Sequence, residues 1–298
     1  MVISMLITRM DITGLMNPET EVRACAFLNE ERKAHALSFH KEKNRAQSVG
    51  AWLLFSYSLH RWLPVSGQEK QMPEEAVDGM PAEVAETQDK GVALAVTEFT
   101  VEKVLEELEA LPLTEREKLL WASKVCIGEH GKPYLQNSSD IFFNLSHSGD
   151  YVLCGIADRQ IGVDIQKRHD KDVSGVKEKI HNAQDKDEDF FLLFSAKEAF
   201  CKCTGEGLQR DLSHIAVDCE KGMVKDTVTG DFGRLFTGTH EGYVETASTL
   251  SLSYLVVEIL KECKSKLALL FIMGVQTKFI LFFPAPLWQP PRDRGGRT

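Results

Sequence analysis

The chain has 298 residues, 43% of them hydrophobic and 27% charged, so it holds enough apolar material for a packed core and is not disordered along its whole length. Its 35 lysines and arginines against 44 aspartates and glutamates give a net charge of −9. This balance excludes the net-basic footprint of a nucleic-acid-binding protein but allows a local basic pocket for a small polyanion. The seven cysteines are irregularly spaced, which favours reduced thiols and a cytoplasmic protein.

The N-terminal region predicts one strand followed by two helices. An apolar run over residues 3–12 indicates the strand, and residues at helical spacing from Asn17 as far as Ala36 indicate an amphipathic helix. A second, long helix is expected over residues 44–63, ending before Pro64.

Residues 66–91 differ in composition from the rest of the chain. They contain repeated glutamate, glycine and proline and no aromatic residue, so they cannot bury enough surface to offset the entropy of ordering them. We therefore expect a flexible acidic insertion here. After it, Thr100 is expected to cap a helix with one apolar stripe, made of Val101, Val104, Leu105, Leu108 and Leu111.

The remaining sequence alternates strand and helix signals. Residues 141–145 and 151–157 flank a polar turn, which predicts a hairpin, and residues 161–165 predict a third strand. A helix is expected from Asp189 to Thr204, ended by Gly205. Further strands are expected near residues 215–217 and 249–259. This order indicates the mixed α+β class.

The most apolar stretch, residues 267–283, is interrupted by Gly274, Gln276 and Lys278. It falls short of the ~20 apolar residues of a membrane-spanning helix. We expect two buried strands here and no membrane span, with an interfacial anchor as the alternative.

Residues 161–166 contain the first candidate metal ligands. On a strand, Asp164 and Gln166 project from the same face. A carboxylate and an amide oxygen on a rigid element are suitable ligands for a hard cation. The alternative is that Asp164 is a turn or cap residue at a strand end.

The helix that contains residues 194–202 carries a second group. Glu198 and Lys202, four residues apart, share one helix face, while Lys197 points about 100° away from Glu198. An isolated pair of this kind is a solvated salt bridge worth ~0.3 to 0.5 kcal/mol. Because apolar residues border the pair, it could instead face a cleft, and Glu198 beside Asp164 would complete a two-carboxylate Mg²⁺ site.

A third group lies on turns. Lys132, Ser146 and His147 offer an ammonium, a hydroxyl and an imidazole, which together can hold phosphate oxygens. His147 alone would be read as a structural turn residue. Cys201 and Cys203 diverge by about 200° on a helix, so buried thiols are favoured over metal or redox chemistry.

Four motifs in one order carry a family resemblance: Gly-Lys-Pro-Tyr at 131–134, Asn-Leu-Ser-His-Ser-Gly at 144–149, Gly-Val-Asp at 162–164 and Phe-Ser-Ala-Lys-Glu-Ala-Phe-Cys-Lys at 194–202. They resemble the 4′-phosphopantetheinyl transferases, in particular the surfactin-type branch that modifies carrier proteins. The resemblance is strong over residues 131–208, weaker over 27–63 and absent from the acidic insertion and from about residue 261 onward.

The resemblance implies a monomer of two similar α+β halves, related by a pseudo-twofold axis, with coenzyme A bound in the cleft between them. The expected division is residues 1–65 and 92–130 for the N-terminal half, 66–91 for the acidic insertion, 131–260 for the C-terminal half with its motifs, and 261–298 for an atypical extension.

It also implies a reaction and its residues. A serine hydroxyl of an apo acyl, peptidyl or aryl carrier protein would attack the pantetheine-side phosphorus and release adenosine 3′,5′-bisphosphate. Glu198 would take the serine proton, and Lys202 would stabilise the leaving oxygen. The cofactor would be Mg²⁺, held by Asp164, Gln166 and Glu198. The residues expected to contact the phosphates and the nucleotide end of coenzyme A are Lys41, Arg45, Lys132, Pro133, Ser146, His147, Lys197 and Lys202.

Two departures from the family pattern leave a second hypothesis open beside the transferase. Many members carry glutamate where this chain has Gln166, and a further arginine where it has Phe55 and Ser56. Both changes would weaken ligand binding. The alternative is therefore a non-catalytic or weakly active coenzyme A-binding relative. An Mg²⁺-dependent nucleotide hydrolase is less favoured because no Walker-type phosphate loop is present.

Overall fold

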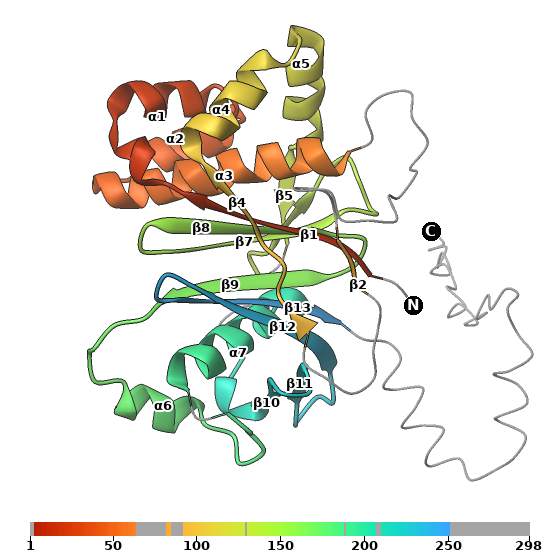
Figure 1. Cartoon of the computed structure of the whole chain (residues 1–298). Coiled ribbons are helices and arrows are strands. Elements are labelled where there is room, and N and C mark those ends of the chain that lie inside the picture. The colour runs from red at the N-terminus through yellow and green to blue at the C-terminus, as the bar shows by residue number, and fades with distance from the viewer. Residues whose placement is uncertain are drawn as a thin grey trace, which may run out of the picture. The chain divides into compact units, whose positions relative to one another are not determined.

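The computed structural model describes residues 3–63, 82–84, 92–128, 130–187, 189–206 and 210–250 (Figure 1). The chain divides into two compact units, Met1–Ser251 and Leu252–Thr298, and the described residues all belong to the first. The expected extension at 261–298, the strands expected within 267–283 and the part of the 249–259 strand beyond Leu250 lie outside the described residues.

The N-terminal elements are β1 (Ile3–Asp11), the 3-10 helix η1 (Thr13–Met16), α1 (Pro18–Cys25), α2 (Glu30–Leu37) and α3 (Glu42–Trp62). Strand β1 and helix α3 confirm the prediction. The single helix expected from Asn17 was wrong, because the chain forms two. The Asn29 side chain accepts a hydrogen bond from the Arg32 amide and so caps a new helix.

The next elements are β2 (Ala82–Val84), β3 (Val92–Ala93), β4 (Thr97–Thr100), α4 (Val101–Ala110), α5 (Leu113–Ala122), β5 (Val125–Ile127) and β6 (Pro133–Leu135). Thr100 caps α4 as predicted, accepting from the Lys103 amide. Within the insertion expected to be flexible, β2 pairs with β1, because an unpaired strand edge offers main-chain groups to any extended neighbour. Residues 66–81 and 85–91 lie outside the described residues.

The last elements are β7 (Phe142–Ser148), β8 (Tyr151–Ala157), β9 (Ile161–Lys167), α6 (Ser174–Ile180), α7 (Phe190–Thr204), η3 (Leu212–His214), β10 (Ile215–Asp218), β11 (Met223–Asp226), β12 (Phe232–His240) and β13 (Tyr243–Leu250). Helix α7 begins and ends as predicted. The Asp189 side chain caps its first turn, and Gly205 follows it with φ 87°, a left-handed conformation that glycine adopts without strain.

Two large sheets lie between the helices (Figure 1), and β5 and β6 form a separate two-stranded sheet. The first has the strand order β2-β1-β8-β7, with β4 parallel to β1, and the second has the order β10-β11-β12-β13-β9, with β3 on β12. Helix α3 packs on the first sheet and α7 on the second. The mixed α+β class is therefore confirmed. Strands β7 and β8 belong to the predicted C-terminal half but share a sheet with β1.

The core has three parts. One cluster fills the space between the N-terminal helices and the first sheet, another lies between the sheets, and a third lies beneath α7. All seven residues of β8 are buried, because α3 covers one side of this strand and β9 lies on the other. None of the helices described in the structure is long and apolar enough to cross a membrane.

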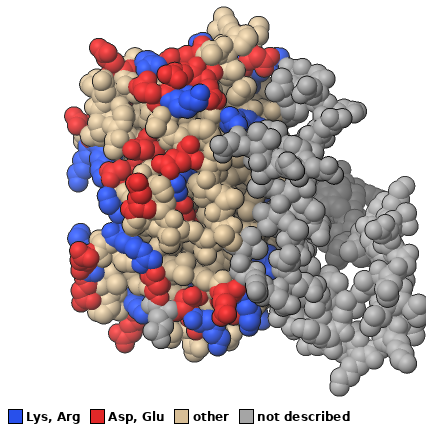
Figure 2. All heavy atoms as spheres, in the orientation of Figure 1, with Lys and Arg blue, Asp and Glu red and all other residues tan. Residues whose placement is uncertain are grey.

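Surface charge is mixed. On the face that Figure 2 shows, acidic and basic side chains of the described residues are interspersed. Several of them are paired at short range; Arg23, for example, binds Glu102 and Glu109 between α1 and α4.

Candidate functional site

The structure brings Asp164 of β9 and Glu198 of α7 together around one lysine. The Lys202 Nζ lies 2.6 Å from the Asp164 Oδ1 and 3.9 Å from the Glu198 Oε2. Asp164 is only 1% exposed, whereas Lys202 is 26% exposed. The two acids are 34 positions apart in sequence. They meet at the same lysine because α7 packs directly on β9.

Two further predicted residues complete the group around Asp164. The Ser146 hydroxyl of β7 donates to the Asp164 Oδ1 at 2.9 Å and accepts from the Lys202 Nζ at 3.0 Å. The Gln166 amide donates to the other oxygen, Oδ2, at 2.9 Å. Both oxygens of this buried carboxylate therefore have partners, as a buried charge requires.

Glu198 has an altered acidity. Its pKa is raised to about 7, chiefly because the carboxyl group is buried; the Asp164 charge contributes to the rise, and the Lys202 charge opposes it. A hydrogen bond with Asp164 adds to the shift. One lysine therefore compensates two neighbouring carboxyl groups only in part, and Glu198 holds a proton for part of the time at neutral pH.

This donor set suits a hard divalent cation. Asp164 and Glu198 supply carboxylate oxygens and Gln166 supplies an amide oxygen, which are the ligands that Mg²⁺ prefers, and a cation would take over the charge compensation that the Glu198 proton now provides. Within the part of the chain that the structure describes, no cluster of three or more His, Cys, Asp and Glu residues could hold a metal. The donors therefore fit a cation that also draws ligands from a bound substrate.

A cleft leads to this group from the N-terminal helices. One cavity of about 380 Å³ is lined by His35, Phe39, Asn44, Gln47, Ser48, Ala51, Trp52, Pro133, Asn144, Leu145 and His147. A smaller cavity of about 210 Å³ is lined by His130, Gly131, Lys132, Pro133, Asn144, Leu145, Lys202 and Gly205. The two share three wall residues, and the second reaches Lys202, so the cleft runs from α2 and α3 to the Asp164 group.

His147 lies on the wall of the larger cavity. Loss of hydration lowers its pKa, and the nearby Lys202 charge lowers it further, while the Asp164 charge has the opposite effect. The charges of Lys202 and Asp164 therefore both act on the His147 ring. Among the predicted residues, the structure brings Asp164, Gln166, Glu198, Lys202 and Ser146 into one group with His147 beside it.

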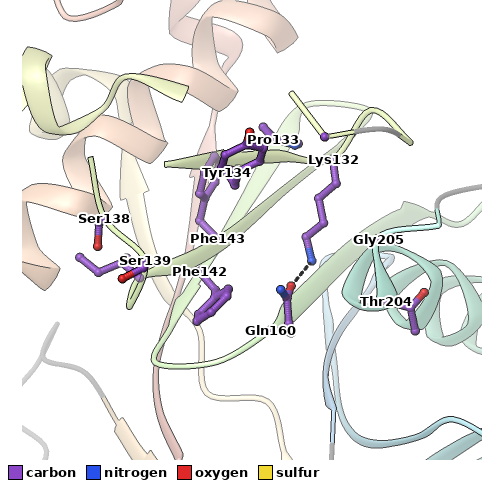
Figure 3. A pocket seen from close by; sticks show the side chains of 12 residues that line it. Lys132, Pro133, Tyr134, Ser138, Ser139, Phe142, Phe143, Gln160, Thr204 and Gly205 are labelled. Carbon is purple, nitrogen blue, oxygen red and sulfur yellow. Dashed lines mark hydrogen bonds between the residues drawn. The ribbon is translucent and has the colours of Figure 1, made fainter. Parts of the chain in front are cut away.

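Lys132 does not extend freely into the cleft. Its Nζ donates to the Gln160 Oε1 at 2.8 Å, to the Cys203 carbonyl at 2.9 Å and to the Ile161 carbonyl at 3.2 Å, and burial lowers its pKa. Figure 3 shows this side chain directed at Gln160, at the edge of a third cavity of about 360 Å³. Lys132 also lines the smaller cavity of the cleft, so its contact with the coenzyme stays a prediction, one that would require it to exchange some of these hydrogen bonds for phosphate oxygens.

Pro133 lines all three cavities. The third cavity is lined on its apolar side by Tyr134, Phe142 and Phe143 (Figure 3). Asp164 and Glu198 line none of the three cavities; Lys202, which binds Asp164, is the member of this trio that lines one, the smaller cavity of the cleft.

Lys197 is directed away from the group. It is 0% exposed, and its Nζ donates to the Ile180 carbonyl at 2.6 Å and to the Asp185 carboxylate at 2.8 Å. The expected phosphate contact of Lys197 is not supported, because its helix face turns toward the segment that follows α6 and not toward the cleft.

The basic residues expected at the start of α3 are also not assembled at the cleft. The Arg45 Nε lies 2.6 Å from the Glu21 Oε1, so its charge is paired with α1. Lys41 is exposed at the N-terminal boundary of α3. Neither lines a described cavity. Phe55, at the position where a further arginine was expected, is buried and stacks on Phe143 at 4.1 Å.

Sequence reasoning missed the cleft wall that α2 and α3 provide. Asn44, Gln47, Ser48 and Ala51 follow the spacing i, i+3, i+4 and i+7, which marks one helix face. Its polar and small side chains are a signal for a cavity rather than a core. His35 and Phe39 of the α2 region pack edge to face at 5.3 Å beside it.

Comparisons with known proteins agree with the motifs. Residues 160–234 match the family model described as the 4′-phosphopantetheinyl transferase superfamily. The 4′-phosphopantetheinyl transferase psf-1 of Bacillus pumilus is 31% identical over 127 residues, covering 39% of this chain and 51% of that protein. The 4′-phosphopantetheinyl transferase Sfp of Bacillus subtilis (strain 168) is 36% identical over 99 residues, covering 30% of this chain and 44% of that protein.

A third relative, the 4′-phosphopantetheinyl transferase gsp of Aneurinibacillus migulanus, is 30% identical over 100 residues, covering 30% of this chain and 41% of that protein. The matched segments thus span about half the length of these relatives or less. The resemblance to the superfamily and to its surfactin-type branch is confirmed.

Proposed function

We propose that this chain, which resembles the 4′-phosphopantetheinyl transferase superfamily most closely through residues 160–234, transfers the 4′-phosphopantetheine group of coenzyme A to a serine of an apo carrier protein. The released product is adenosine 3′,5′-bisphosphate. The observation that carries the proposal is the convergence of Asp164, Glu198 and Lys202 at the end of a cleft that begins at α2 and α3.

The cleft has features suited to a nucleotide that carries phosphates. Trp52, Phe39 and His35 supply ring surfaces in the larger cavity, on which a heteroaromatic base can pack. Lys202 lies at the smaller cavity and supplies the positive charge that a pyrophosphate needs. With its base in the larger cavity and its pyrophosphate beside Lys202, coenzyme A would have its reacting phosphorus close to Asp164 and Glu198.

The residues of the group have complementary roles in the transfer. The serine oxygen forms a bond to the pantetheine-side phosphorus, and the bond from that phosphorus to the oxygen of the adenosine bisphosphate breaks. Glu198 accepts the serine proton as a general base. Lys202 stabilises the negative charge that develops on the leaving oxygen.

Mg²⁺ would be held by Asp164, Glu198 and Gln166 and would neutralise charge on the phosphate oxygens. Ser146 and Gln166 fix the orientation of the Asp164 carboxylate. The neutral amide of Gln166 in place of a third carboxylate predicts a weakly held cation. The proposal extends to a monomeric cytoplasmic enzyme built of two halves, with residues 131–260 as the C-terminal half.

The test is incubation of the protein with coenzyme A, Mg²⁺ and an apo carrier protein, followed by mass spectrometry of the carrier. We expect a mass increase of one phosphopantetheine group. Glu198→Gln and Lys202→Ala should each lower turnover by about 10² to 10⁴-fold, because they remove a general base and a charge on the leaving oxygen.

Matched controls are Glu178→Gln and Lys179→Ala, which change the same residue types at exposed positions of α6 and should retain turnover. In the same assay, Gln166→Glu should lower the Mg²⁺ concentration needed for half-maximal rate. Near-wild-type turnover of both Glu198→Gln and Lys202→Ala would remove these residues from the mechanism. Tight coenzyme A binding without transfer by the wild-type protein would favour the non-catalytic binder.

A further inference from the structure

Among the strands that the structure describes, only β13 pairs with β9, so one edge of β9 has no strand partner there. Strand β9 pairs with β13 through the register Asp164↔Thr246 and Gln166↔Val244. In an antiparallel pair, alternate residues turn their main-chain groups away from the partner strand. The buried amides of Val163 and Ile165 therefore need other acceptors, because buried N–H groups are almost always paired; the amide of Lys167 faces the same way at the exposed end of the strand.

Three side chains of β7 supply these acceptors. Asn144 Oδ1 accepts from the Val163 amide at 2.9 Å, Ser146 Oγ from the Ile165 amide at 3.3 Å, and Ser148 Oγ from the Lys167 amide at 2.9 Å. The spacing of two residues on both strands makes these bonds a regular series. We call Asn144, Ser146 and Ser148 the side-chain ladder.

Lysine side chains bind the carbonyl groups along the same edge. The Lys202 Nζ donates to the Val163 carbonyl and the Lys132 Nζ to the Ile161 carbonyl, each at 3.2 Å. The outer edge of β9 from Ile161 to Lys167 is thus bound by side chains rather than by a neighbouring strand. This joins the edge of the second sheet to β7, the edge strand of the first.

Side-chain bonds leave room that direct strand pairing would not. Paired strands lie about 4.8 Å apart, which leaves no space for a third group between them. Here the Lys202 Nζ reaches Ser146 of β7 and Asp164 and Val163 of β9 at once. The ladder therefore holds the strands in register while Lys202 enters between them.

We propose that the side-chain ladder positions Asp164 for the reaction. Asp164 lies between the Val163 and Ile165 amides, and the three bonds of the ladder together fix β9 along β7, whose Asn144, Leu145 and His147 line the cleft. Ser146 also orients the carboxylate directly. Asn144 and Ser148 act through β9 and are positioning residues, a role that rests on the proposed function.

Ser148 is the residue to test, because it lines none of the three cavities and its hydroxyl binds the Lys167 amide. In Ser148→Ala, hydrogen exchange followed by NMR should show faster exchange at Lys167, by about two- to tenfold, as expected for loss of one hydrogen bond. Ser148→Thr keeps a hydroxyl acceptor and should restore protection. The exposed serine variant Ser174→Ala, in α6, is the matched control.

The positioning role predicts a second effect in the same variants. Titration of Mg²⁺ into the protein with coenzyme A should show weaker cation binding for Ser148→Ala, by about two- to tenfold. Turnover should fall with an unchanged KM for coenzyme A, and Ser148→Thr should restore both. If Ser148 only stabilised the fold, its loss would not lower turnover while leaving the KM for coenzyme A unchanged.

The outcomes separate the two proposals. Unchanged exchange at Lys167 in Ser148→Ala would refute the ladder. Faster exchange with unchanged Mg²⁺ affinity and turnover would refute the positioning role. Absence of transfer by the wild-type protein would refute the proposed function and the positioning role with it, whereas the exchange measurement, which needs neither coenzyme nor carrier, would still establish the ladder.

Discussion

Lys197 and Lys202 lie five residues apart on α7 but in different surroundings. Lys202 reaches Asp164 at the cleft, whereas Lys197 is buried against Asp185. Asp185 is only 1% exposed and also accepts hydrogen bonds from the Asn182 and Val217 amides. Lys197 therefore compensates a buried charge that organises the segment after α6, a stabilising role that differs from the predicted phosphate contact.

Lys197→Met should lower the free energy of unfolding by about 3 kcal/mol, because it leaves the Asp185 carboxylate buried without its cation. Urea unfolding would measure the loss. The double variant Lys197→Met/Asp185→Asn should lose less free energy of unfolding than the Lys197→Met and Asp185→Asn variants lose together. Lys118→Met, at an exposed pair on α5, should change stability by less than about 0.5 kcal/mol. Normal stability with lost turnover in Lys197→Met would instead indicate a phosphate contact.

At the scale of elements, the candidate site depends on close packing of α7 on β9. Gly162 of β9 has no side chain, and a Cβ at this position would lie 2.9 Å from the Cys203 Cα and would also meet the main chain at Ala199 and Cys203. These are backbone atoms, which cannot move aside as a flexible side chain can. The glycine therefore lets α7 approach until Glu198 and Lys202 reach Asp164.

Gly162→Ala should push α7 away from β9. We expect a loss of about 1 to 3 kcal/mol in the free energy of unfolding and lower turnover, because Asp164 would separate from Glu198 and Lys202. Gly175→Ala on α6, where a Cβ would meet nothing within 4 Å, is the control and should leave both unchanged or raise stability slightly. Wild-type stability and turnover in Gly162→Ala would contradict this account of the packing. Denaturation and the transfer assay together would decide it.

At the scale of the molecule, a buried charge network joins the two sheets. Arg9 of β1 lies 2.6 Å from the Glu245 Oε1 of β13 and 2.7 Å from the Glu98 Oε2 of β4. The Arg9 and Glu245 side chains are only 7% and 3% exposed. Arg9 and Glu245 are 236 positions apart, so this contact links the first and last described strands of the chain.

Arg9→Met should lower the free energy of unfolding by about 3 to 5 kcal/mol, because it leaves Glu245 as an uncompensated buried charge. Adding Glu245→Gln should recover part of the loss. Arg23→Met breaks a surface network whose side chains are 37 to 55% exposed and should cost at most about 1 kcal/mol. Urea denaturation of the three variants gives the comparison. If Arg9→Met and Arg23→Met lowered the free energy of unfolding equally, burial would not explain the contribution of the Arg9 network to stability.

Local signals in the sequence determined most of the element boundaries. Thr100 and Asp189 begin helices and Gly205 ends one because capping and left-handed geometry involve residues within one turn. The spacing of Glu198 and Lys202 placed both on one face of α7 for the same reason. Asn29 was missed as a cap because the helical spacing continues past it.

Only the tertiary structure decided which of the predicted charged residues meet. Lys132 is bound to the Cys203 carbonyl, Lys197 to Asp185 and Arg45 to Glu21, and each partner lies on an element that the sequence could not place beside it. A side chain's role depends on the nearest opposite charge or free main-chain group in space. The sequence alone therefore determined the local structure and the motif order, while the packing of α7 on β9 and of β9 against β7 decided the composition of the site.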